Sequence, residues 1–393
     1  MRERAHEILA LGAADALAHF KVDLDRLART ADFVASVIRN NYPTLKVPLH
    51  ARWRHFVFGG RGLWAEAAAR TAWRDAPARA RAAFDLAIVS VLLDAGAGAS
   101  WRYRDAATGL VAGRSEGLAL ASLRMFETGL FSADACDPLR ADASRLAVLT
   151  GADLARGFQA GADNPLTGLD GRAALLARLG QTMLDNPHVF ARTDDARAGG
   201  LFDHLAAAAD GKTLAASAML HALLIHLGPI WTGRLTLAGI ALGDTWRHRG
   251  IKRDDASNGL MPLHKLSQWL SYSLIEPLQQ AGLTVTDIDG LTGLAEYRNG
   301  GLFVDAEVIT SRAPVTGPLP VDSEAVVEWR ALTVALLDRL LPSVRDRLDV
   351  SAADFPLGAL LEGGTWAAGR KLAKEKRADG QPPIEVINDG TVF

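Results

Sequence analysis

The run of polar side chains at residues 296–301 is the part of this sequence best suited to chemistry. It reads Glu296, Tyr297, Arg298, Asn299, Gly300 and Gly301, and Asp305 follows a short apolar stretch. A tight turn needs only the Asn-Gly pair, so the three side chains before Asn299 exceed what a turn requires. We therefore predict Glu296 and Asp305 as catalytic carboxylates. The same loop supplies the predicted substrate-binding residues Tyr297, Arg298 and Asn299.

A second polar cluster, residues 47–56, brings two imidazoles, two guanidiniums and one indole into six positions. Its members are His50, Arg52, Trp53, Arg54 and His55. Charged and aromatic groups of these kinds bind sugars, phosphates and the faces of bases. We predict that all of them except Arg54 bind substrate. The alternative is a junction between a helix and a loop whose arginines pair with surface carboxylates.

Asp94 occupies an unusual position for a carboxylate. It ends the apolar run 86–93, close to the expected C-terminus of a helix, where the helix dipole favours cations. The conflict predicts either a cationic partner, for which residues 101–104 offer two arginines, or a catalytic task. A structural salt bridge explains the position equally well, so Asp94 is a catalytic candidate with that alternative open.

A third group of polar and aromatic residues lies between positions 228 and 269. Within it, Asp244 is a further catalytic candidate, and the predicted substrate-binding residues are Trp246, His264, Lys265 and Trp269. Indoles are costly to expose, and the wall of a binding pocket is one reason to keep them. The alternative is that the indoles of Trp231 and Trp246 fill the core.

Helical periodicity dominates the elements that must position these residues. Apolar residues recur every three to four positions, which predicts helices at 5–20, 24–40, 62–74, 77–95, 115–129, 139–150, 168–185, 213–227, 265–281, 322–348 and 365–379. Strand signals are short: they predict a small β-hairpin near 295–312 and one strand at 384–393. No long Gly-, Ser- or Pro-rich linker divides the chain. We expect a mainly α, compact multi-helix fold in a single domain, residues 1–393.

Composition and missing motifs argue against several classes of protein. The chain has 43 basic and 45 acidic side chains, which disfavours nucleic-acid binding through phosphate contacts. Its one cysteine cannot form an intramolecular disulfide, and no Walker loop, GxGxxG, HExxH or GxSxG motif occurs. We expect a cytoplasmic enzyme that acts on a small molecule, with no cofactor, no bound metal and no nucleic-acid or membrane partner. A homo-oligomer is left open.

Several of these groups belong to a longer series of motifs in a fixed order. The series comprises residues 50–56, 90–98, 114–117, 164–166, 171–172, 243–244, 264–269, 296–301 and 389–393. It closely resembles the uracil catabolism protein 4 family of fungi and bacteria, from about residue 5 to the end. Thr232, where the family has proline, and Ala51, where it has serine, are minor departures. The Glu-Tyr-Arg element at 296–298 also resembles, distantly, the Asp-Tyr-Arg element of the queuosine-nucleotide N-glycosylase family.

These resemblances imply a pathway and, by analogy, a fold. The first family is placed in a pyrimidine-degradation route that converts uracil to its ribotide and opens the ring. The route is thought to pass through a ribosylurea-type intermediate. The second family has a helical fold related to DNA glycosylases, and the analogy extends that fold to this chain on the strength of a short motif.

Three functions are compatible with the residues and the resemblances. The preferred one is an N-glycosyl hydrolase of uracil catabolism that acts on a ribosylurea-type N-riboside, with or without a 5′-phosphate. Carboxylates would stabilise the oxocarbenium-like ribose and activate water. The first alternative is a C–N amide or ureido hydrolase acting on the opened ring, with metal ligands drawn from His50, His55, His248, His264 and Asp94. The second is a non-catalytic scaffold for the pathway.

Overall fold

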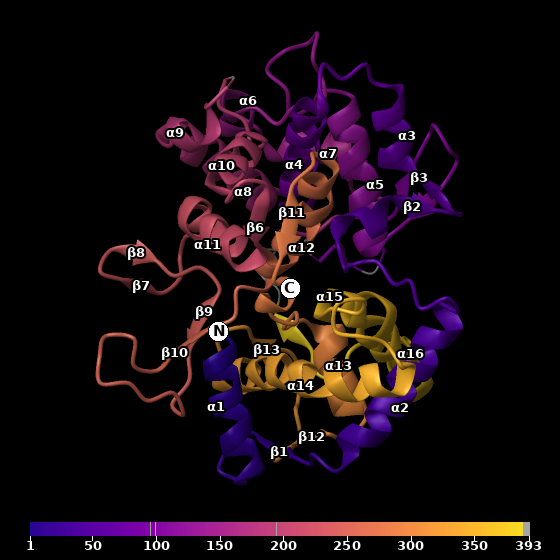
Figure 1. Cartoon of the computed structure of the whole chain (residues 1–393), viewed down its shortest axis with the longest axis vertical. Coiled ribbons are helices and arrows are strands. Elements are labelled where there is room, and N and C mark those ends of the chain that lie inside the picture. Colours follow the sequence, from indigo (N-terminus) through magenta and orange to yellow (C-terminus); the bar gives the residue numbers. More distant parts are fainter. Residues whose placement is uncertain (95, 99, 194, 388–393) are drawn as a thin grey trace. The chain divides into compact units, whose positions relative to one another are not determined.

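The protein is mainly helical, as its sequence predicts. A computed structural model describes residues 1–94, 96–98, 100–193 and 195–387. The α-helices in Figure 1 are α1 (Arg2–Ala13), α2 (Arg26–Asn41), α3 (Leu63–Arg70), α4 (Ala76–Leu92), α5 (Arg114–Glu127), α6 (Ala143–Ala147), α7 (Gly151–Gly157), α8 (Leu169–Asp185), α9 (Pro187–Phe190), α10 (Gly200–Ala208), α11 (Ala216–His226), α12 (Lys265–Gln280), α13 (Tyr297–Asp305), α14 (Glu324–Leu348), α15 (Leu357–Leu360) and α16 (Trp366–Lys376). Shorter helical segments are the 3₁₀ turns η1 (Arg52–Phe56), η2 (Gly228–Ile230) and η3 (Ile288–Gly290) and the π-helical η4 (Leu361–Thr365).

The strands are short and associate only in pairs within the described residues. The antiparallel pairs are β1 (Phe20–Val22) with β12 (Ile309–Ser311), β2 (Val57–Phe58) with β3 (Arg61–Gly62), β4 (Tyr103–Arg104) with β5 (Val111–Ala112), β7 (Thr236–Leu237) with β8 (Ile240–Ala241), and β9 (Thr245–Arg247) with β10 (Leu260–Pro262). The parallel pairs are β6 (Thr213–Ala215) with β11 (Thr284–Thr286), and β13 (Leu319–Pro320) with β14 (Val386–Ile387). Two-stranded ribbons are too small to enclose a core, so the helices bury most of the apolar side chains.

By its internal contacts the chain divides into two units. Within the described residues, unit 1 comprises Met1–His50, Gly233–Gln268 and 288–387, and unit 2 comprises Ala51–Thr232 and Trp269–Asp287. Helix α12 contributes its first turn to unit 1 and the rest of its length to unit 2. The single domain expected from the sequence stays a prediction.

Helix α14 is the central element of unit 1. Helices α1 and α2 pack on it, and α13 packs on both α14 and α16 (Figure 1). Its N-terminus is capped by Ser323, whose hydroxyl accepts a hydrogen bond from the N–H of Val326. The burial of α14 extends to polar residues: Glu328 accepts a hydrogen bond from the N–H of Phe20 at 2.9 Å and contacts His248 at 3.2 Å. Such a helix is expected to lie in the interior of a folded unit.

The β-hairpin predicted near 295–312 is wrong. Residues 297–305 form helix α13, and the strand that follows, β12, pairs with β1 near the N-terminus. Gly300 and Gly301 lie within this helix, where their lack of a side chain lets neighbouring residues pack closely against the backbone. A Cβ on Gly300 would lie 2.7 Å from the indole of Trp329, and one on Gly301 would lie 3.0 Å from Pro383. The Asn-Gly signal is therefore overridden by tertiary packing.

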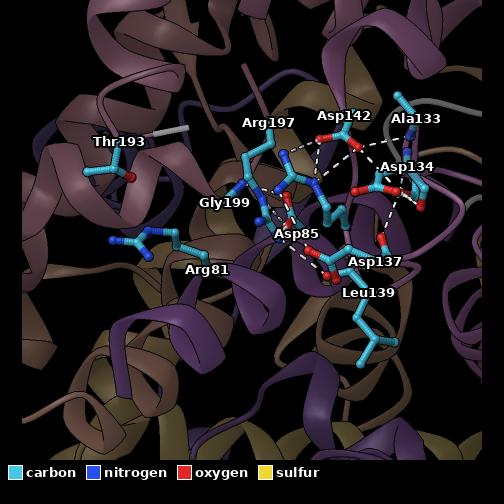
Figure 2. Close-up of polar contacts among 12 residues, drawn as sticks. Arg81, Asp85, Ala133, Asp134, Asp137, Leu139, Asp142, Thr193, Arg197 and Gly199 are labelled. Carbon is cyan, nitrogen blue, oxygen red and sulfur yellow. Dashed lines mark hydrogen bonds and ion pairs between the residues drawn. The ribbon is translucent and has the colours of Figure 1, made fainter. Parts of the chain in front are cut away.

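Helix α4 is the central element of unit 2 and is buried on nearly all sides. It packs against α5, α8 and α10. A buried carboxylate, Asp85, interrupts its apolar surface and accepts hydrogen bonds from Nε of Arg197 at 2.8 Å and from the N–H of Gly199 at 2.6 Å (Figure 2). Burial raises the pKa of Asp85 to about 6, although the Arg197 charge opposes the shift. This ion pair fastens the segment before α10 to α4.

The predicted helices are largely confirmed, with differences at their ends. The first helix ends at Ala13 and is followed by a loop and β1, and the segment predicted at 213–227 begins with β6. Helices α7, α9, α10, α13 and α15 were not predicted. Of the strand predicted at 384–393, residues 386–387 form β14, and residues 388–393 lie outside the described residues. None of the helices in the described ranges combines the length and apolar composition needed to cross a membrane.

Candidate active site

Glu296 is the N-cap of helix α13. Its backbone is extended, and its carboxylate turns back onto the first turn of the helix. One oxygen accepts a hydrogen bond from the N–H of Arg298 at 2.7 Å, and the other accepts one from the N–H of Asn299 at 2.6 Å. Each oxygen keeps further lone-pair capacity, since a carboxylate oxygen can accept more than one hydrogen bond. The helix N-terminus thus holds Glu296 in one orientation.

Burial makes the Glu296 carboxyl a stronger base than an ordinary glutamate. The side chain is nearly removed from solvent, and this desolvation raises its pKa above the usual 4.5. The two backbone N–H groups, and then the charges of Lys265 and His50, act in the opposite direction but do not cancel the effect. A buried carboxyl with a raised pKa next to cationic groups is typical of general acid–base sites.

His50, whose charge acts on Glu296, contacts a second glutamate that the sequence motifs did not identify. Nδ1 of His50 lies 2.7 Å from the Glu362 carboxylate, and the backbone N–H of His50 donates to Gly358 at 2.9 Å. The imidazole also lies 6.4 Å from the ring of Trp366. A carboxylate on Nδ1 fixes the tautomer and orientation of a histidine. Glu362 therefore holds the His50 imidazole in one orientation.

Glu362 lies in the π-helical segment η4, an element that often marks functional sites. The two glycines that follow it allow the segment to approach α2 and the loop after it. A Cβ on Gly363 would lie 2.8 Å from Val47, and one on Gly364 would lie 2.8 Å from Val34. The run Glu362-Gly363-Gly364 is the one local signal in the sequence, because an acidic residue directly before two glycines allows a close approach of the backbone.

Lys265 begins helix α12, and Asp244 holds that helix end in place. The Asp244 carboxylate accepts a hydrogen bond from the N–H of Lys265 at 2.9 Å, and its backbone carbonyl accepts from the N–H groups of Leu263 and His264. His264 adopts a left-handed conformation (φ +49°) to make this connection. A strained backbone of this kind persists only where the surroundings enforce it. Asp244 thereby positions Lys265.

The Asp244 carboxylate is already occupied by several strong hydrogen bonds. Arg330 donates two hydrogen bonds to its carboxylate at 2.7 and 2.8 Å, and Nε1 of Trp246 donates one at 2.6 Å. Burial alone would raise the pKa of Asp244, but the Arg330 charge and these hydrogen bonds outweigh it and lower the pKa well below its usual range. A carboxylate so stabilised is a poor proton acceptor. The geometry favours a positioning role over the catalytic one predicted from the sequence.

Trp246 and His264, both predicted to bind substrate, are buried or nearly so beside Asp244. The guanidinium of Arg234 lies 5.2 Å from the centre of the Trp246 ring, and Nε2 of His264 lies 3.3 Å from the hydroxyl of Thr245. Burial lowers the pKa of His264, which favours its neutral form. Their substrate-binding role stays a prediction.

Asp305 is not brought together with Glu296. It ends helix α13, whose nine residues place it about 13 Å along the axis from the N-cap. There Arg377 donates two hydrogen bonds to its carboxylate at 2.8 and 2.6 Å. This bidentate pair ties α13 to the end of α16. The catalytic role predicted for Asp305 therefore lacks geometric support.

The remaining residues of the 296–301 element differ in their surroundings. The guanidinium of Arg298 lies 4.9 Å from the centre of the Tyr297 ring and donates to the carbonyl of Gly380 at 3.1 Å. Nδ2 of Asn299 donates to the carbonyl of Leu294, whereas its Oδ1 is buried without a hydrogen-bond partner among the described residues. A buried oxygen without a donor is uncommon in folded proteins. It is a candidate acceptor for a substrate hydroxyl or N–H.

Unit 2 contains the cationic partner predicted for Asp94. That partner is Arg52, whose Nη1 lies 3.0 Å from the Asp94 carboxylate, and not the arginines at 102 and 104. Nε of Arg52 donates to the hydroxyl of Ser90 at 2.7 Å. Arg172 lies close enough that the Asp94 charge partly offsets the effect of burial, which lowers the pKa of Arg172 to about 10. The sequence interpretation of Asp94 as half of an ion pair is supported, and its catalytic role stays a prediction.

The other predicted binding residues of unit 2 form an aromatic group around Arg52. The Arg52 guanidinium lies 5.6 Å from the ring centre of Trp269, and His55 lies edge-on to the same ring at 5.7 Å. Nε1 of Trp53 donates to the carbonyl of Ser273 at 2.7 Å. These residues are buried or partly buried and packed together. Arg52 itself is fully buried, so the alternative of an arginine paired at the surface does not apply to it.

The histidines named for a metal-assisted reaction have separate partners. His50 contacts Glu362, His248 contacts Glu328, and His264 contacts Thr245. Among the residues that the structure describes, no three His, Cys, Asp or Glu side chains converge in a way that could hold a metal ion.

Comparison with known proteins assigns the chain to a family. A family model described as "Protein of unknown function (DUF1688)" matches residues 1–393. The chain belongs to this family. "Uracil catabolism protein 4" of Lachancea kluyveri is 37% identical over 413 residues, which cover 95% of this chain and 92% of the relative. "Protein urg3" of Schizosaccharomyces pombe is 38% identical over 407 residues, covering 100% and 96%. The family predicted from the sequence motifs is confirmed.

Proposed function

We propose that this member of the DUF1688 family is a hydrolase of uracil catabolism that cleaves the N-glycosidic bond of a ribosylurea-type N-riboside. The name of the Lachancea kluyveri relative supports the pathway. The observation that carries the reaction type is the buried Glu296 carboxyl, which α13 holds in one orientation and on which the charges of Lys265 and His50 act. We place the reaction in the cytoplasm, on a small-molecule substrate and without a cofactor.

The proposed reaction adds water across the bond between ribose C1′ and the urea nitrogen. As this bond breaks, the electron pair leaves with nitrogen, and positive charge develops on the ribose ring. The Glu296 carboxylate stabilises this charge and removes a proton from the water that attacks C1′. His50, oriented by Glu362, delivers a proton to the departing nitrogen. The products are ribose, or its 5′-phosphate, and urea, and all atoms balance.

Lys265 has a supporting role in this scheme. Its charge lowers the pKa of Glu296 and so opposes the effect of burial. The Glu296 carboxylate therefore stays ionised to a lower pH than it would without Lys265, although its pKa remains above that of an ordinary glutamate. Asp244 fixes the position of Lys265 through the first turn of α12.

Urea release from ribosylurea tests the proposal. The purified protein is incubated with ribosylurea, with and without a 5′-phosphate, and free urea is measured over time. Glu296→Gln keeps one oxygen to cap α13 but cannot accept the proton, so turnover should fall by about 10²–10⁴-fold. Glu375→Gln on the exposed surface of α16 is the matched control and should leave turnover unchanged. The proposal is refuted if neither substrate releases urea. Ammonia as the product would favour ureido hydrolysis.

A further inference from the structure

A cavity of about 200 Å³ lies within unit 2, and the proposed reaction makes no use of it. It is lined by residues of η1, β2, β3, α3, α4 and α12. Three of the lining residues are aromatic. Trp53 and Trp64 have ring centres 6.1 Å apart and planes inclined by 30°, and Phe56 lies 5.8 Å from Trp53. Indole and phenyl faces of this kind stack on flat rings.

The polar side of the cavity carries two guanidiniums and one carboxylate. Arg54 forms an ion pair with Glu276, which leaves Arg79 as the uncompensated charge of the lining. Arg79 has no ion-pair partner among the described residues, and its Nε–H is buried without an acceptor. Nε–H of Arg54 is likewise buried without an acceptor. Buried donors without acceptors are rare, and an anionic ligand would supply what they lack.

The size of the cavity limits what it can hold. Pockets for drug-sized ligands enclose about 300–1,000 Å³, so this one suits a single ring with a small substituent. Of the small anions, a carboxylate matches the planar guanidinium of Arg79 through two parallel hydrogen bonds.

We propose that this cavity binds a single planar ring that carries a carboxylate. The ring stacks against Trp53 and Trp64, and the carboxylate pairs with Arg79. The site takes a small aromatic or heteroaromatic acid, and this binding is separate from the chemistry of Glu296.

Calorimetric titration with four probes tests each part of the proposal. Orotate and benzoate have both the ring and the carboxylate and should bind. Uracil has the ring without the charge, and acetate has the charge without the ring. Both should bind at least about tenfold more weakly than orotate, because each lacks one of the two contacts.

Two arginine variants then locate the site. Arg79→Gln should weaken orotate binding about tenfold or more and leave the affinity for uracil unchanged. Arg74→Gln is the matched control, since Arg74 is exposed on the turn before α4, pairs with Asp75 and does not line the cavity. Glu296→Gln should bind orotate like the wild type. Circular dichroism confirms that each variant is folded. The proposal is overturned if uracil or acetate binds as tightly as orotate, or if Arg79→Gln keeps the wild-type affinity.

Discussion

Replacement of Asp244 by asparagine should destabilise the protein strongly. The Asp244 carboxylate accepts hydrogen bonds from Arg330, Trp246 and the N–H of Lys265, and the Arg330 side chain is 1% exposed. Asp244→Asn leaves the Arg330 charge buried without its counter-charge. Removing one partner of a buried ion pair costs about 3–5 kcal/mol. This is a large part of the roughly 5–15 kcal/mol by which folded proteins are stable.

Urea denaturation followed by circular dichroism at pH 7 gives the free energy of unfolding. Glu307→Gln is the matched control in the same unit, because Glu307 pairs with Arg26 at an exposed position. Its loss should change stability by less than about 1 kcal/mol. A loss in Asp244→Asn no larger than in this control would refute the reasoning.

The effect of Asp244 should also depend on pH. Its pKa is lowered in the folded protein, so its contribution to stability is complete above the ordinary value of 3.8. The contribution is lost as the pH falls through the folded-state pKa. The difference between wild type and Asp244→Asn should therefore narrow below pH 3.8. A difference that widened there would contradict the assigned sign of the shift.

Three further substitutions test the roles assigned to the site and its supports. Asp305→Asn weakens the pair with Arg377 and should lower the free energy of unfolding by about 1–3 kcal/mol. Turnover per folded molecule should stay unchanged, and its loss in a folded variant would indicate that Asp305 is catalytic. Gly300→Ala should destabilise by about 1–3 kcal/mol because its methyl group meets Trp329, whereas Gly171→Ala in α8, where the space is open, should be neutral or stabilising in thermal unfolding. Lys265→Met should move the acid limb of the kcat/KM profile to higher pH, since the Lys265 charge lowers the pKa of Glu296; an unmoved limb would exclude this interaction.

The sequence predicted the helices well because their apolar periodicity matches the faces they bury. It failed at residues 297–305, where Asn299 and Gly300 favour a turn in isolation. Two contacts favour a helix there. Glu296 caps the first turn, and Gly300 lets Trp329 of α14 approach closely. A local pattern contains no information about a partner helix that lies later in the chain.

The candidate site was predicted in part. Residue types alone singled out Glu296, His50 and Lys265, and the structure gives them a common electrostatic environment. They did not identify Glu362, because its significance arises from its contact with His50, 312 positions away. Nor could they separate Glu296 from Asp244. Both carboxylates have little exposure to solvent, and only the contact with Arg330 shows that the charge of Asp244 is already paired.

The most direct test of the central claim follows the urea carbon through the reaction. Ribosylurea labelled with ¹³C at the carbonyl is turned over by wild type, Glu296→Gln and Glu375→Gln, and the products are identified by ¹³C NMR. N-glycosidic cleavage predicts labelled urea from the wild type and the Glu375 control, and at least a hundredfold slower formation by Glu296→Gln. Labelled bicarbonate in place of urea, or a wild-type rate in Glu296→Gln, would contradict the account.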